Sequence, residues 1–129
     1  MKNIAALIVL LLLNNIGFAQ SGPKIKILQA ENTIDYGKVS KSNDNGVRSF
    51  TFTNVGDAPL NINEIQSTAS CTILYKPSQP IAPGKSDKIE IKYNMVPGPI
   101  RKTITLETNA VNYEEGRVPL KIKGEIVSN

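Results

Sequence analysis

The chain has 129 residues, of which 40% are hydrophobic and 20% are charged, and its formal net charge is +4 at pH 7. It contains no histidine and a single cysteine, which excludes histidine-based acid–base catalysis and an internal disulfide. The lysines and arginines are scattered, so the modest positive charge favours solubility and gives no indication of a nucleic-acid partner.

The first 19 residues have the layout of a secretory signal peptide. Lys2 precedes an apolar run at residues 4–13, and two asparagines then interrupt the run before it is long enough to cross a membrane. Small residues lead to a predicted cut between Ala19 and Gln20. Removing Lys2 with the peptide changes the net charge from +4 to +3. We therefore expect residues 1–19 to be a signal peptide, and residues 20–129 to be exported without a stable membrane span.

After residue 20, apolar and polar side chains alternate along short segments, which is the pattern of half-buried strands. In chain order, the predicted strands are residues 24–30, 33–36, 49–53, 60–65, 88–93, 103–108 and 118–126. Glycine, proline and asparagine separate these segments at short intervals, and no linker or repeat is visible. The pattern predicts an all-β chain that forms one immunoglobulin-like antiparallel β-sandwich of seven to eight strands over residues 20–129.

Three connections carry specific expectations. In the segment that begins at Asn54, Gly56 is expected to supply a backbone conformation that other residues resist. Pro83 and Gly84 have the order that a type II turn requires. Residues 43–46, Asn-Asp-Asn-Gly, resemble part of a calcium loop but lack the later acidic ligands, so we predict a plain hairpin connection there.

Catalytic and metal-binding residue types are scarce. Glu114 and Glu115 are adjacent carboxylates, but they stand beside Gly116 in an apparent turn, where solvated charges are usual. Zinc and copper sites would lack their common ligands, because the chain has no histidine and one cysteine. We predict no catalytic, cofactor-binding or metal-binding residue and no enzymatic activity.

The single thiol, Cys71, has three interpretations. A nucleophile needs a lowered pKa from a nearby cation, and Lys76 is the nearest cation that follows it. A partner in an intermolecular disulfide needs an exposed sulfur. A small buried residue needs only apolar neighbours such as Ile73 and Leu74, and free cysteine is among the most buried residue types. We favour the buried interpretation.

Four segments together resemble a family of exported bacterial proteins. Residues 50–60, FTFTNVGDAPL, resemble an F-x-F-x-N-x-G-x-x-P-L run, and residues 80–84, PIAPG, resemble its P-I-x-P-G turn. Residues 104–109 and 120–126 resemble its closing strands. The family is the domain of unknown function 1573, common in Bacteroidetes, and the resemblance covers residues 33–127. It implies an immunoglobulin-like fold related to the major sperm protein and Hydin-type domains, and a place in the periplasm or on the surface of a Gram-negative bacterium.

The segment around Cys71 departs from that family. Its usual Cys-Gly-Cys-Thr run aligns with residues 69–72, where Ala69 and Ser70 replace the first cysteine and the glycine. Chemistry that needs two thiols is therefore lost from this chain.

Three functions remain as hypotheses. The leading one is a non-catalytic exported module that binds an unidentified protein or envelope component. The second is a thiol-dependent redox or metal-handling protein that uses Cys71. The third is a binder of anionic envelope glycans through Lys88, Lys92, Lys121 and Lys123, although these lysines also fit a solvated face.

Overall fold

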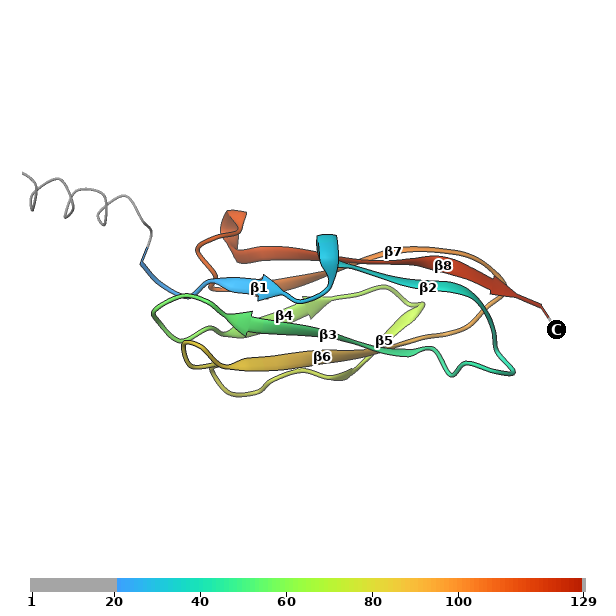
Figure 1. Ribbon diagram of the computed structural model, residues 1–129, viewed down its shortest axis with the longest axis horizontal. Coiled ribbons are helices and arrows are strands. Elements are labelled where there is room, and N and C mark those ends of the chain that lie inside the picture. The colour runs from blue at the N-terminus through green and yellow to red at the C-terminus, as the bar shows by residue number, and fades with distance from the viewer. Residues whose placement is uncertain (1–20, 129) are drawn as a thin grey trace, which may run out of the picture.

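The computed structural model describes residues 21–128, so the predicted signal peptide and the cut between Ala19 and Gln20 lie outside the described residues. Within this range, eight strands form two four-stranded sheets, which lie against each other as two layers (Figure 1). This arrangement confirms the predicted all-β sandwich.

Each sheet has four strands, but consecutive strands of the chain do not alternate regularly between the two sheets. Sheet A has the strands β1 (Ile25–Ile27), β3 (Val47–Asn54), β6 (Ser86–Tyr93) and β5 (Cys71–Tyr75), in that spatial order. Sheet B has the strands β2 (Thr33–Ser40), β8 (Arg117–Val127), β7 (Gly98–Thr108) and β4 (Ile62–Gln66). Two 3-10 turns, η1 (Ala30–Asn32) and η2 (Glu114–Gly116), precede β2 and β8.

The core lies between the sheets and follows the alternation of the sequence. In sheet A, Phe50 lies directly opposite Ile89 on the neighbouring strand, and in sheet B, Ile104 lies opposite Leu120. All four side chains are completely buried. Burial of each such side chain stabilises the fold by about 1.5–3 kcal/mol, so this interior drives the pairing of the two layers.

One strand pair differs from the expected antiparallel arrangement. β2 runs parallel to β8, with Thr33 opposite Lys121 and Val39 opposite Ile126. The other pairs of named strands within residues 21–128 are antiparallel. The alternation within a strand fixes which side chains are buried but does not encode the direction of a neighbour that is distant in sequence.

The prediction of a hairpin at residues 43–46 is wrong, because β2 and β3 belong to different sheets and residues 41–46 cross between them. Side chains hold this crossing in place. The Arg48 guanidinium donates to both carboxylate oxygens of Asp44, at 3.1 and 2.8 Å. It also stacks 4.1 Å from the ring centre of Tyr36, whose hydroxyl donates to the Gly46 carbonyl at 2.7 Å.

The side chain of Asn54, at the end of β3, is a second connecting point and is completely buried. Its amide nitrogen donates to the carbonyls of Ala58 and Ile81, each at 2.8 Å. Its amide oxygen accepts from the backbone nitrogens of Gly56 at 2.9 Å and Lys24 at 3.4 Å. One side chain therefore joins the N-terminal segment, the β3–β4 loop and the segment before β6.

The two glycines singled out in the sequence serve different purposes. Gly84 has φ 81°, and the Lys85 backbone nitrogen donates to the Ala82 carbonyl at 3.0 Å, which is the geometry of a type II turn. Gly56 does not have the expected positive φ. It is needed for space, because a Cβ there would collide with the Gly22 carbonyl oxygen and the Lys24 nitrogen.

Replacing Asn54 with alanine is expected to lower the free energy of unfolding by about 3 kcal/mol, because buried backbone groups lose their partners. Urea denaturation measures this change. The matched control is Asn63→Ala, which removes an exposed asparagine and should cost less than about 0.5 kcal/mol. Equal costs for the two variants would contradict the role assigned to Asn54.

The stability of the chain is expected to fall at high pH because of Tyr36. Burial raises the pKa of Tyr36 from 10.0 to about 12, and the charge of Arg48 acts in the opposite direction. The unfolded chain therefore loses this proton first, so the contribution of Tyr36 is complete below pH 10 and is lost towards pH 12. Denaturation of the wild type and Tyr36→Phe across this interval measures the effect. The wild type should decline more steeply, and identical slopes would refute this explanation.

Candidate functional site

Two edge strands, one from each sheet, lie beside each other in the sandwich. β4 ends the order of sheet B, and β5 ends the order of sheet A. A hollow of about 390 Å³ lies between them, lined by Glu64, Ile65, Ile73, Leu74, Tyr75 and Lys76. We call this surface the β4–β5 edge.

Apolar side chains are exposed on this surface. Leu74 is 47% exposed and Tyr75 is 42% exposed, while Ile65 and Ile73 are partly buried against the core. The register of β5 against β6 shifts between Ile73 and Tyr75, so Leu74 is the extra residue of a bulge. Bulges at sheet edges redirect side chains, and this one accompanies an outward-facing leucine.

Backbone contacts fix the positions of the two edges relative to each other. Leu60, just before β4, and Ile81, between β5 and β6, form an isolated antiparallel bridge with hydrogen bonds of 2.9 and 2.8 Å. The Ile81 carbonyl also accepts from the amide of Asn54. Closer to the hollow, the Lys76 ammonium donates to the Asn63 carbonyl at 3.5 Å. The edge is therefore built on the same buried contacts that organise the fold.

Tyr75 is held at the outer rim of this surface. Its hydroxyl donates to a carboxylate oxygen of Asp87 at 3.2 Å, and the Lys88 ammonium lies 5.9 Å from its ring centre. A ring held by neighbours loses little side-chain freedom when a partner binds, and such tyrosines are favoured at protein interfaces.

Cys71 begins β5, opposite Tyr93, and packs in the core with an exposure of 5%. Burial raises the pKa of its thiol, while a hydrogen bond with Thr68 and the charge of Lys102 act in the opposite direction. A raised pKa lowers the fraction of reactive thiolate at neutral pH. The placement therefore supports the interpretation of Cys71 as a small buried residue.

The described part of the chain offers little for metal binding or acid–base chemistry. Among residues 21–128, no three acidic or cysteine side chains gather closely enough to hold a metal ion. Glu114 and Glu115 lie in η2, and both are exposed to solvent. In the same range, no helix has the length and apolar character needed to cross a bilayer.

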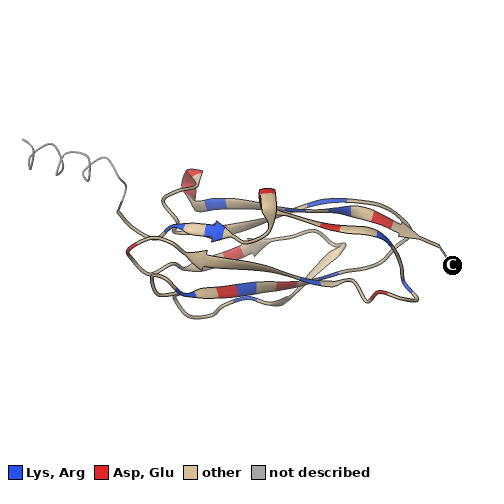
Figure 2. Ribbon diagram, viewed as in Figure 1, with Lys and Arg blue, Asp and Glu red and all other residues tan. Residues whose placement is uncertain are grey.

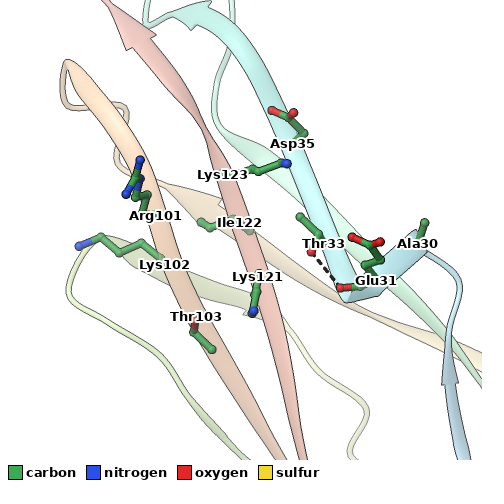
Figure 3. A pocket seen from close by; sticks show the side chains of 10 residues that line it. All are labelled: Ala30, Glu31, Thr33, Asp35, Arg101, Lys102, Thr103, Lys121, Ile122 and Lys123. Carbon is green, nitrogen blue, oxygen red and sulfur yellow. Dashed lines mark hydrogen bonds between the residues drawn. The ribbon is translucent and has the colours of Figure 1, made fainter.

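The four lysines proposed to bind anionic glycans do not form one surface. Lys88 and Lys92 are exposed on β6 of sheet A, whereas Lys121 and Lys123 are exposed on β8 of sheet B. The prediction of a single four-lysine patch is therefore wrong. On sheet B, the two lysines instead lie with Arg101 of β7 around a hollow of about 600 Å³ (Figure 3). Arg101 was not among the predicted site residues, although alternation along β7 places it on the polar face.

The thiol of Cys71 is expected to react slowly in the native chain. Its reaction with a disulfide reagent should be at least about tenfold slower than in urea, because the sulfur must first be exposed by an opening of the structure. Absorbance of the released thiolate measures both rates. Complete labelling of the native protein during mixing would contradict the burial of Cys71.

Several solved structures share the fold at low sequence identity. A protein of unknown function from Porphyromonas gingivalis W83 is 19% identical with a TM-score of 0.63, and the match covers 86% of this chain and 51% of that one. The VesB protease of Vibrio cholerae is 16% identical with a TM-score of 0.61, covering 79% of this chain and 32% of that one. The ASH/PapD-like domain of human CEP192 is 10% identical with a TM-score of 0.54, covering 82% and 87%.

These similarities establish an immunoglobulin-like, PapD-like fold, and the chain spans about a third of the VesB chain and half of the Porphyromonas chain. No curated protein matches the sequence. A family model described as "Protein of unknown function (DUF1573)" matches residues 27–126, which is most of the chain and agrees with the resemblance seen in the sequence. The chain therefore belongs to the DUF1573 family.

Proposed function

We propose that this chain is a non-catalytic, exported module that binds a protein partner in the envelope of a Gram-negative bacterium. The observation that carries the proposal is the β4–β5 edge, where exposed Leu74 and Tyr75 flank a hollow between two edge strands. The occupant that fits is an extended segment of the partner, whose main chain pairs with β5.

The chemistry of the edge favours a protein segment over a small polar ligand. Four apolar or aromatic side chains from two strands form a continuous surface, Ile65, Ile73, Leu74 and Tyr75. The backbone groups of an edge strand can form hydrogen bonds with the main chain of almost any extended segment, which provides affinity. The apolar side chains beside them select which segment binds. When a partner binds, Leu74 and Tyr75 would bury apolar area, and Glu64 and Lys76 would form the polar rim of the interface.

Export and the absence of catalysis rest on the sequence. Residues 1–19 have the layout of a signal peptide, and the chain lacks histidine. The similarity to parts of longer chains in Vibrio cholerae and Porphyromonas gingivalis is compatible with a fold used as a module.

Site-specific photocrosslinking tests this proposal. A photoreactive amino acid placed at Leu74 should form one discrete adduct with an envelope protein in living cells. The same group at Arg117, an exposed residue on β8, is the matched control and should not form that adduct. Mass spectrometry identifies the crosslinked peptide.

Competition makes the experiment specific to the edge. Purified wild-type chain should suppress the adduct, whereas the Leu74→Arg/Tyr75→Arg variant should compete at least about tenfold less well, because two apolar contacts are lost. Adducts of the same kind at Leu74 and Arg117, or equal competition by both proteins, would refute the proposal.

A further inference from the structure

A second surface lies on the outer face of sheet B. Its hollow of about 600 Å³ is formed by β2, β7 and β8, with the first residues of η1 at one side (Figure 3). We call it the basic hollow after Arg101, Lys102, Lys121 and Lys123, which line it. The Lys and Arg segments of β7 and β8 lie next to each other (Figure 2).

The strand register brings three of these cations together. Lys123 lies directly opposite Arg101 across the β7–β8 pair, and Lys121 is two residues away on the same face of β8. Opposite residues in antiparallel strands have Cα atoms about 5 Å apart. Residues i and i+2 of a strand are about 7 Å apart. The three positive charges therefore occupy a patch that one ligand can span.

Within residues 21–128, the cations of this patch, Arg101, Lys121 and Lys123, form no ion pair with an acidic side chain. Elsewhere on sheet B, Arg117 lies opposite Glu107, with 3.9 Å between the guanidinium and the carboxylate. Like charges directly opposite each other destabilise a sheet. Asp35, opposite Lys123 on β2, offsets part of the cost of this cation pair, and a bound anion would offset the rest.

Acceptors and hydroxyl groups surround the cations. Thr103 and Thr33 lie opposite Lys121 on its two sides, and Asp35 lies opposite Lys123 on β2. Glu31 also lines the hollow. A ligand that matches this lining carries anionic groups for the cations and hydroxyl groups that donate to the carboxylates.

We propose that the basic hollow binds an anionic polysaccharide, in which carboxylate or sulfate groups alternate with free hydroxyls. An acidic peptide has few hydroxyl groups that could donate to Glu31 and Asp35, so these carboxylates would repel it without a compensating hydrogen bond. A flat anionic membrane does not enter a hollow, and the same two acids oppose its approach. The hollow is separate from the β4–β5 edge, so this proposal does not depend on the proposed protein partner.

Calorimetric titration of the full chain with polygalacturonate oligomers at low salt tests the proposal. Arg101→Glu should weaken binding at least about tenfold, because a charged contact is lost and a repulsive one is gained. Lys92→Glu makes the same change of charge on an exposed site of sheet A and should change binding less than about twofold.

Thermal unfolding of the same variants provides a second measurement. Arg101→Glu should raise Tm by about 2–4 °C, because Lys123 then lies between two carboxylates instead of between Asp35 and a second cation. A rise in Tm together with lost binding also shows that the variant is folded.

Three results would overturn the proposal. The first is no binding of polygalacturonate by the wild type, and the second is equal loss of binding in Arg101→Glu and Lys92→Glu. The third is binding of polyglutamate, or of vesicles rich in anionic lipid, as tight as that of polygalacturonate. Photocrosslinking at Leu74 should be unaffected by Arg101→Glu, so failure of this proposal and failure of the proposed protein interaction are distinguishable.

Discussion

The buried amide of Asn54 is the contact on which the arrangement of the two sheets at this end of the sandwich depends. It satisfies carbonyl and amide groups from the N-terminal segment, the β3–β4 loop and Ile81. Through Ile81 it supports the bridge to Leu60, which holds the approach to β4 beside the segment that follows β5. An unsatisfied polar group in this position would be costly, so the loops can adopt few alternatives. This arrangement keeps the edge of β4 next to the edge of β5.

The interior and the exterior of the sandwich have separate roles. The space between the sheets is filled by apolar side chains, and every buried side-chain polar atom among the described residues has a hydrogen-bond partner. Such a core stabilises the fold. The two surfaces that we propose for recognition lie on the outside, and one of them is apolar and lies between two strand edges. The other surface, the basic hollow, is positively charged and lies on the outer face of sheet B. The two surfaces therefore suit different ligands.

Local features were predictable from the sequence, whereas features that join distant segments were not. Phe50 and Phe52 alternate with polar residues in the sequence, and both are completely buried in the structure. This agreement is expected because every second side chain of a strand points to the same face of the sheet. It could not show that β2 pairs in parallel with β8, nor that Lys88 and Lys121 belong to opposite sheets. The need for glycine at Gly56 arises from the approach of Gly22, which no local pattern encodes.

If this fold acts by binding at defined outer surfaces, nuclear magnetic resonance should locate the ligand on one of them. Backbone amide shifts of the isotopically labelled chain are recorded during titration with polygalacturonate oligomers. We expect shifts confined to the strands around the basic hollow, at Thr33, Asp35, residues 101–103 and residues 121–123. Shifts of equal size at Lys88 and Lys92 on sheet A, or no shifts at all, would contradict this expectation.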